Sequence, residues 1–560
     1  MRLSTDEDRD EARALETIAA AIEAGVTVFD TARSYGRGAE ELGHNEDLLA
    51  RTLRGRRARV VTKGGMARSG GAWVPDGRAR TIRADCEASL EALDGLPIDL
   101  YLVHAPDPRT PWRTTVRALA RLVDDGLVER VGVCNVTRGQ LDEALDLAPI
   151  AAVQVALSPF DERALRGGVV ERCDEVGIAL VAHSPLGGPR RAGRLGRRED
   201  LVGVADAHDV TPAEVVLAWL LGLSPVVVAI PGARRPETAR SSARAATLEL
   251  EPAERTLLAG ALGGLRRSSR RRAAARREGE VVVVMGIPGA GKSRIAESYA
   301  AHGHERLNRD ERGGSLRDLA AALDEVLAAG ATRVVLDNTY LTRAARSHVV
   351  EIAARHRLPA RCVWLDTPLA QAQVNLVERL LDHFGSLPTP EELKQEARRV
   401  PGLHTPTTQM RTLRELEPPE LDEGFADIER VPFERTPTEG APGVLVAAPA
   451  ITSPGWERMV AGADPTAPHL VFDWRPGAIV DELDAVAGLL AKVVSGPVER
   501  ALCPHTGGPP SCWCRPPLPG LPLAFARAHR LDPTHSILVG TSTAHRTLAA
   551  TLVARYESID

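Results

Sequence analysis

Eight residues at positions 286–293, GIPGAGKS, carry the most specific chemical signal in the chain. They follow the apolar run EVVVVM and precede a helical pattern, which is the context that a phosphate-binding loop (P-loop) requires. In such a loop, backbone N–H groups surround the phosphates of ATP, Lys292 neutralises the charge in transfer, and Ser293 holds Mg²⁺. The residues that we expect to contact the nucleotide are Gly286, Gly289, Ala290, Gly291, Lys292 and Ser293.

Phosphoryl transfer to an alcohol also needs a base, and the stretch HERLNRDERGG offers Asp310. This aspartate follows a predicted strand, where its carboxylate can accept the proton of an attacking hydroxyl. Capping of a helix N-terminus is the alternative role for Asp310. The next predicted strand ends in VVLDNT, so we expect Asp337 to face the phosphates.

Four titratable residues near the N-terminus lie at or just after the ends of predicted strands, namely Asp30, Tyr35, Lys63 and His104. Catalytic side chains gather at such strand ends in a parallel barrel. We expect the Lys63 ammonium, held by Asp30, to lower the pKa of the Tyr35 phenol, because a nearby cation favours phenolate. Tyr35 would then protonate a carbonyl oxygen as hydride arrives, while His104 orients the carbonyl.

A third group, CxH(x₆)CxC, consists of Cys503, His505, Cys512 and Cys514. Three thiolates and one imidazole form a closed tetrahedral Zn²⁺ site, and a site without an open position is structural. The two pairs are too close together for helices, so we expect a loop. Free cysteines that merely coexist are the alternative, while seven cysteines in 560 residues exclude a disulfide scaffold.

The elements that position the N-terminal group alternate β-branched runs with amphipathic stretches over residues 1–265. The runs are VTVFD, ARVVTK, DLYLVH, RVGVCN, AAVQVAL, IALVAHS and VVVAIPG. Such repeats predict an α/β fold with a (β/α)8 barrel. Because a full barrel needs eight strands, the first is either the short MRLS or absent, and the true start can lie upstream of Met1.

Three further segments follow the barrel. Residues 266–277 contain seven arginines and predict a linker, either simply solvated or contacting a phosphate backbone. Residues 278–437 predict a three-layer P-loop α/β domain, and 440–560 a smaller α/β domain.

Composition limits the possible partners. Lys+Arg 70 against Asp+Glu 75 gives a net charge of −5, so nucleic acid could bind only at local basic patches. No apolar run reaches the ~18 residues of a membrane span. The acidic N-terminus, MRLSTDEDRDEAR, differs from a signal peptide. We therefore expect a soluble cytoplasmic protein with no membrane partner.

The motifs FDTARSYG, VVTKGG, DLYLVHAPD, GVCNVT and LVAHSPLGG make residues 1–262 resemble an aldo-keto reductase. The resemblance implies that the four residues above form the catalytic tetrad for a small-molecule carbonyl substrate. It also implies that NADP(H) is the cofactor. Asn135 and Gln154 would then bind the nicotinamide amide, and Arg234 and Arg240 would bind the 2′-phosphate. The chain departs from the family at Leu157, where an aromatic ring commonly stacks on nicotinamide.

The motifs GIPGAGKS, LNRD and LDNT make residues 280–415 resemble the kinase domain of phage and bacterial 5′-polynucleotide kinases. The resemblance implies that Asp310 activates a 5′-OH of RNA or DNA, that Arg312 contacts the acceptor phosphate and that Arg379 clamps the donor phosphates. Small-molecule kinases and toxins that phosphorylate sugar nucleotides share these motifs. The arginines that favour a polyanionic acceptor are Arg309, Arg312, Arg343, Arg346, Arg398 and Arg399.

The stretch CPHTGGPPSCWCRPPLPG resembles the zinc loop of histidinol- and heptose-phosphate phosphatases of the haloacid dehalogenase (HAD) class. The nucleophile motif would fall at 448–452, which holds no aspartate, and Thr541 replaces an acidic metal ligand. Aspartyl-phosphate chemistry cannot run without these carboxylates. The resemblance therefore implies a degenerate phosphatase-like domain that keeps its zinc.

Together these patterns predict an ATP-dependent polynucleotide 5′-kinase fused to an NADP(H)-dependent reductase-like barrel and an inactive phosphatase-like domain. One alternative is a carbonyl reductase whose kinase portion regulates it or phosphorylates a small molecule. The other is a binding protein in which ATP only gates assembly.

Overall fold

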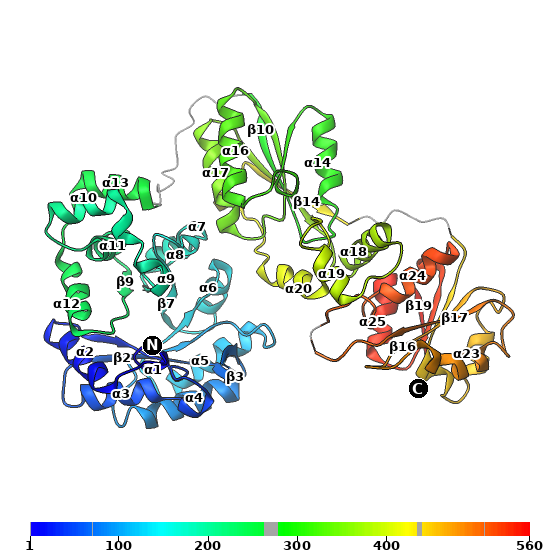
Figure 1. Cartoon of the computed structure of the whole chain (residues 1–560), viewed down its shortest axis with the longest axis horizontal. Coiled ribbons are helices and arrows are strands. Elements are labelled where there is room, and N and C mark those ends of the chain that lie inside the picture. Colours follow the sequence, from blue (N-terminus) through cyan, green and yellow to red (C-terminus); the bar gives the residue numbers. More distant parts are fainter. Residues whose placement is uncertain (1, 70, 263–277, 434–439, 509, 560) are drawn as a thin grey trace. The chain divides into compact units, whose positions relative to one another are not determined.

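The computed structural model describes residues 2–69, 71–262, 278–433, 440–508 and 510–559 (Figure 1). The chain forms two compact units, residues 1–272 and 273–560, which we describe separately. The predicted arginine-rich linker at 266–277 lies outside the described residues. No helix in the described part of the chain is long and apolar enough to cross a membrane.

Unit 1 is built around one parallel sheet of seven strands, in the chain order that a barrel requires. The strands are β1 (Val28–Asp30), β2 (Arg59–Gly64), β5 (Leu100–Val103), β6 (Val131–Cys134), β7 (Ile150–Ala156), β8 (Ala179–His183) and β9 (Val227–Ile230). Of the two alternatives for the first strand, the described residues agree with its absence, because Arg2, Leu3 and Ser4 belong to helix α1 (Arg2–Thr5). The parallel sheet is therefore nearly closed rather than complete, with β1 and β9 at its edges.

Helices join the barrel strands and cover the sheet. The longer ones are α2 (Glu11–Glu23), α3 (His44–Leu53), α4 (Ala79–Ala92), α5 (Trp112–Asp124), α6 (Arg138–Leu145), α8 (Val169–Val176), α10 (Glu199–Ala207), α11 (Pro212–Leu221), α12 (Pro236–Arg244) and α13 (Pro252–Leu262). In α5 the buried residues Val116, Leu119 and Leu122 recur at helical spacing and join the core. A hairpin, β3 (Met66–Ser69) and β4 (Ala72–Pro75), follows β2 outside the sheet.

Unit 2 contains two parallel five-stranded sheets. The first, in the P-loop module, has the order β11-β12-β10-β13-β14. Its strands are β10 (Glu280–Met285), β11 (Glu305–Asn308), β12 (Arg333–Asp337), β13 (Ala360–Asp366) and β14 (Asp427–Pro432). Its helices are α14 (Lys292–Ala301), α15 (Arg309–Arg312), α16 (Leu316–Ala328), α17 (Arg343–Arg355), α18 (Leu369–Phe384), α19 (Pro390–Glu396) and α20 (Pro406–Glu415).

The central strand β10 explains why EVVVVM is apolar at successive positions. Val281, Val283 and Met285 join the cluster that contains residues of α16 and α17. Val282 and Val284 join a different cluster with residues of α14 and α18. A strand buried on both faces carries no polar alternation.

The second sheet of unit 2, in the C-terminal module, has the order β17-β16-β15-β18-β19. Its strands are β15 (Val444–Ala447), β16 (His469–Trp474), β17 (Val498–Cys503), β18 (Ile537–Gly540) and β19 (Arg555–Ser558). Its helices are α21 (Ala448–Ile451), α22 (Trp456–Ala461), α23 (Asp484–Leu490), α24 (Gly520–His529) and α25 (Thr543–Leu552).

Helix α18 belongs to the cores of both modules of unit 2. Its residues Leu376, Val377 and Leu380 lie in one apolar cluster with Phe472 of β16 and Leu548 of α25. Figure 1 shows α18 beside α24 and α25, with which it makes contact. The C-terminal module is therefore joined to the P-loop module by a shared core.

Candidate functional site

The barrel brings the four expected residues of the N-terminal group together. Lys63 is fully buried, and its Nζ donates to Asp30 Oδ2 over 2.6 Å. The same ammonium lies 5.2 Å from the centre of the Tyr35 ring. The His104 ring centre lies 5.7 Å from that of Tyr35. This arrangement can present a phenol and an imidazole to one carbonyl oxygen.

The pKa of Tyr35 corrects the sequence-based expectation. Burial raises the pKa of this phenol, and the Lys63 charge, which lowers it, is the smaller effect. Burial alone would lower the pKa of Lys63, but the charges of Asp30 and Tyr35 raise it above its usual value. The expected lowering was wrong because tyrosine is only 8% exposed and desolvation disfavours phenolate. Tyr35 is therefore held in the protonated form, which is the form that donates a proton.

His104 is neutral at physiological pH. Burial lowers its pKa to about 3, and the charge of Lys63 adds to this effect. The Nδ1 atom lies 3.3 Å from the Ser34 hydroxyl. A neutral imidazole can donate one N–H to a carbonyl oxygen, which agrees with the orienting role expected for His104.

Trp73 was missed by our sequence interpretation. It lies on β4, and its ring centre is 6.0 Å from those of Tyr35 and His104. The Arg68 guanidinium of β3 lies 4.1 Å from the Trp73 ring centre. The glycine-containing segment MARSGGAWVP after the second strand was the available signal, because such segments connect hairpin strands.

The residues expected to bind NADP(H) already have partners within unit 1. Gln154 Nε2 donates to Asp30 Oδ1 over 2.7 Å, and Asn135 Oδ1 lies 3.0 Å from His183 Nε2. Both amides thus lie beside the tetrad. The two arginines differ, because Arg234 is paired with Asp6 and Asp8, and Arg240 with Glu23. The ion pairs with these acids would have to break before either guanidinium could bind a phosphate.

The P-loop connects β10 to α14, as its motif requires. Lys292 Nζ donates to the carbonyl oxygens of Gly286 and Ile287, both over 3.0 Å. Gly289 has φ of +86°, and a Cβ there would lie 2.3 Å from the carbonyl oxygen of Ala372 on α18. Only glycine fits this close approach, so α18 contributes to the shape of the loop.

Burial and several neighbouring charges act on Lys292. Burial lowers the pKa of Lys292 to about 8; the Arg379 charge adds to the lowering, and the carboxylates of Asp337 and Asp310 oppose it. Asp337 is buried at the end of β12, where Arg306 and Asn308 donate to its Oδ2. Phosphate oxygens at the loop would favour the charged ammonium.

Asp310 lies on α15, the short helix that follows β11. Its backbone N–H donates to Asn308 Oδ1 over 2.6 Å, so Asn308 rather than Asp310 caps this helix. The Asp310 side chain is 45% exposed, and its Oδ1 lies 3.4 Å from Nη2 of the neighbouring Arg309. Arg312 on the same helix is exposed. Arg379 on α18 is also exposed, and its Nη1 donates to the carbonyl oxygen of Gly402 over 3.2 Å.

Two arginines that we expected near a polyanionic acceptor have a structural role instead. Arg346 is fully buried and forms a 2.6 Å ion pair with Glu423. Arg343 is 10% exposed and pairs with Asp422 over 2.8 Å. Both connect α17 to the segment before β14, a strand that our sequence analysis did not predict. Neither guanidinium is free to contact nucleic acid.

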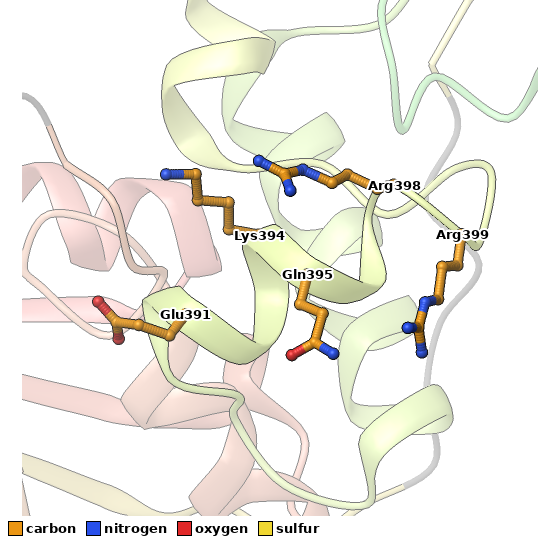
Figure 2. A pocket seen from close by; sticks show the side chains of 5 residues that line it. All are labelled: Glu391, Lys394, Gln395, Arg398 and Arg399. Carbon is orange, nitrogen blue, oxygen red and sulfur yellow. The ribbon is translucent and has the colours of Figure 1, made fainter.

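A different basic surface surrounds α19. An open pocket of about 530 Å³ is lined by Glu391, Lys394, Gln395, Arg398 and Arg399. Figure 2 shows their side chains extending from the helix and the turn after it. All three cations are exposed. Three cations against one carboxylate favour an anion at this surface.

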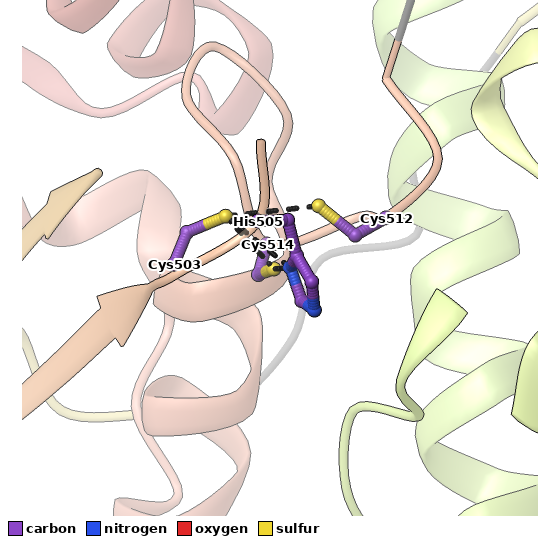
Figure 3. A group of neighbouring side chains, drawn as sticks. All are labelled: Cys503, His505, Cys512 and Cys514. Atoms are coloured by element: carbon purple, nitrogen blue, oxygen red, sulfur yellow. Dashed lines mark hydrogen bonds between the residues drawn. The ribbon is translucent and has the colours of Figure 1, made fainter. Parts of the chain in front are cut away.

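Four candidate metal ligands lie together at the end of β17 and in the loop after it, as their spacing predicted. The ligand atoms of Cys503, His505, Cys512 and Cys514 all lie within 4.8 Å of one another (Figure 3). The sulfur atom of Cys503 lies 3.7 Å from that of Cys512 and 3.2 Å from that of Cys514. Tetrahedral Zn–S bonds of about 2.3 Å would place two sulfurs about 3.8 Å apart. The donor set and the Cys503–Cys512 distance therefore fit zinc, whereas Cys503 and Cys514 would have to move apart to bind it.

Comparison with known proteins defines the class of unit 1. The aldo/keto reductase family model matches residues 1–261. Aldo-keto reductase str7 of Strobilurus tenacellus is 31% identical over 264 residues, which cover 42% of this chain and 76% of that protein. Probable aldo-keto reductase 1 of Glycine max is 33% identical over 248 residues, which cover 39% and 70%. The chain therefore belongs to the aldo/keto reductase family through its barrel.

A crystal structure of an aldo/keto reductase from Klebsiella pneumoniae in complex with NADP and acetate is 26% identical. The match covers 46% of this chain and 87% of that one, with a TM-score of 0.39. A second protein-family model, described as an AAA domain, matches residues 281–400. This match supports a nucleotide kinase-like P-loop domain there.

Proposed function

We propose that the P-loop module is an ATP-dependent kinase that phosphorylates the 5′-OH of a polynucleotide, in RNA or DNA repair. The observation that carries this proposal is the placement of Asp310. Its carboxylate is 45% exposed, and its charge acts on the Lys292 ammonium in the P-loop. Asp310 is thus open to an incoming alcohol while it lies near the expected phosphates.

In the proposed reaction Asp310 accepts the hydroxyl proton as the 5′ oxygen attacks the γ-phosphorus of ATP. The bond from this phosphorus to the bridging oxygen breaks, and ADP leaves. Lys292 and Arg379 supply positive charge on the donor side. A magnesium ion held through Ser293 would neutralise charge on the β- and γ-phosphates.

The basic surface around α19 supports an extended polyanion as acceptor. Lys394, Arg398 and Arg399 offer several cations to consecutive phosphates, which a small sugar or nucleoside acceptor does not need. Arg312 lies two residues from Asp310, where it can contact the phosphate next to the reacting hydroxyl. A polynucleotide is therefore favoured over the small-molecule acceptors.

Transfer of labelled phosphate from ATP to 5′-OH oligonucleotides tests this function. Asp310→Asn removes the base but keeps the size of the side chain, and it should lower kcat by about 10²–10⁴-fold. ATP affinity should stay close to that of the wild type. Full activity of Asp310→Asn, or a wild type inactive on RNA and DNA ends, would reject the proposal.

The tetrad geometry favours a second activity, the NADP(H)-dependent reduction of a small carbonyl compound by the barrel. A bound NADPH would supply the hydride. Tyr35 would donate its phenolic proton to the carbonyl oxygen, and Lys63 would stabilise the developing phenolate. His104 would donate a hydrogen bond to the same oxygen. The substrate wall would include Trp73.

NADPH oxidation with a panel of aldehydes and ketones tests the barrel. Tyr35→Phe removes only the phenolic oxygen, so it should abolish turnover while a thermal shift with NADPH is retained. A wild-type barrel that shows neither turnover nor a shift would leave unit 1 as a scaffold. ATP binding without phosphate transfer would instead support the binding-protein alternative.

We also propose that the C-terminal module is an inactive, zinc-holding relative of HAD phosphatases. Its strand order places β15 at the centre of the sheet. Residues Ala448–Ile451 follow this strand as α21 and carry no carboxylate. The four-ligand cluster is closed, so its metal would be structural. A nucleophilic role for Asp473 is disfavoured, because its carboxylate pairs with Arg475.

A further inference from the structure

The loop that carries the four candidate metal ligands, residues 503–514, also contacts the segment 402–409 of the P-loop module. Trp513 lies between two of the ligand cysteines and is 2% exposed. Its Nε1 donates to the carbonyl oxygen of His404 over 2.9 Å. A second hydrogen bond, of 2.9 Å, runs from the Thr407 hydroxyl to the backbone of the same loop.

The segment 402–409 contacts the nucleotide site with its other residues. Gln409 is fully buried, and its Nε2 donates to the carbonyl oxygen of Pro288 in the P-loop over 3.3 Å. Gly402 accepts the hydrogen bond of Arg379, the proposed donor-phosphate clamp. Eight residues thus connect the metal-ligand loop to both parts of the phosphate site.

The pKa of His404 is affected by charged groups of the proposed phosphate site. Burial lowers its pKa to about 4, and the charges of Lys292 and Arg379 lower it further. The carboxylate of Asp310 acts in the opposite direction. The residue whose carbonyl receives the Trp513 hydrogen bond is therefore within electrostatic reach of the proposed catalytic groups.

Apolar packing joins the same two segments. Leu403 is 4% exposed and belongs to one buried cluster with Cys512, Trp513 and Cys514. Leu393 of α19 belongs to this cluster too. A displacement of the ligand loop would therefore disturb packing beneath the segment as well as its hydrogen bonds.

We propose that a zinc ion bound by the 503–514 loop positions the 402–409 segment against the P-loop, so that zinc occupancy sets the affinity for ATP. Without a metal, no bonds to a shared ion would hold the three thiols and the imidazole together. The irregular loop would then gain conformational entropy. The two hydrogen bonds to the segment would then be lost. The inference rests on the proposed zinc site and on ATP binding by the proposed kinase.

Full-length protein saturated with Zn²⁺ is the material for the test, and the Kd of a fluorescent ATP analogue is its readout. Trp513→Phe keeps an aromatic ring but removes the N–H. The matched control is Trp474→Phe, because Trp474 Nε1 donates to His505 of the same loop over 2.8 Å. Within the described residues, Trp474 forms no hydrogen bond with the 402–409 segment. Chelated and zinc-restored wild type complete the series.

Loss of one buried hydrogen bond should raise the Kd about fivefold in Trp513→Phe. Chelated protein should show at least this increase, zinc should restore wild-type affinity, and amides of 402–409 should exchange faster in both weakened forms. A Kd for Trp513→Phe within twofold of wild type, or an equal rise in Trp474→Phe protein that keeps its zinc, overturns the inference. If wild type binds ATP but phosphorylates no polynucleotide, the kinase proposal alone fails, because the Kd comparison still decides the coupling.

Discussion

Replacement of Arg346 by alanine tests whether this arginine stabilises the P-loop module or contacts the acceptor. The side chain is fully buried, and its guanidinium bonds both carboxylate oxygens of Glu423, over 2.6 Å and 2.8 Å. It also donates to the carbonyl oxygens of Tyr340, Leu341 and Glu417. Truncation would remove a guanidinium donor from each of these acceptors, although Leu341 would keep the backbone N–H of Glu417 and Glu423 Oε1 that of Glu420.

The magnitude follows from the burial of the partner. The Glu423 side chain is 2% exposed, so water could not readily replace the lost guanidinium. We expect Arg346→Ala to lower the free energy of unfolding of the P-loop module by about 3–5 kcal/mol. The double variant Arg346→Met, Glu423→Met should recover most of this loss, because no charge stays buried. Native-state hydrogen exchange of the β10 amides measures these changes.

Arg398→Ala is the matched control, because Arg398 is exposed in the basic pocket. It should change stability by less than about 0.5 kcal/mol and raise the KM for a polynucleotide. The reasoning is refuted if Arg346→Ala keeps wild-type stability and instead raises that KM.

Two further predictions concern protons and metal. The pKa of His104 is about 3 in the folded barrel against about 6.5 when unfolded. The unfolded chain alone therefore binds a proton between these values, so barrel stability should fall as pH drops through this range. His104→Gln should flatten this part of the curve of melting temperature against pH, and an unchanged curve would contradict the assignment. Cys512→Ser should lose about one equivalent of zinc by elemental analysis; full zinc content would exclude this ligand.

Short sequence patterns were sufficient to predict the locations of the chemical groups. GIPGAGKS lies between β10 and α14 as expected, because a loop of this composition needs only the strand before it and the helix after it. The seven barrel strands were also predicted, since their β-branched runs are buried in the sheet. The candidate metal ligands from Cys503 to Cys514 lie so close in sequence that one short segment brings them together.

Composition did not predict the secondary structure of segments whose conformation depends on contacts with distant parts of the chain. Arg2, Leu3 and Ser4, which were one candidate for the first strand, belong to helix α1, and the sheet has seven strands. The proline- and acid-rich region near position 430 contains β14, which pairs with β13 along its whole length. An edge strand of this kind, with mostly exposed side chains, has little apolar signal of its own.

By itself, the sequence determined which chemical groups are present and in which order, because motif spacing is a local property. Only the tertiary structure decided what those groups experience. Arg346 and Arg398 are the same residue type, yet one is buried against Glu423, 77 positions away, and the other faces an open pocket. Tyr35 has its pKa raised rather than lowered, because burial outweighs its neighbouring cation. Burial and pairing depend on segments far apart in the chain, and folding alone brings these together.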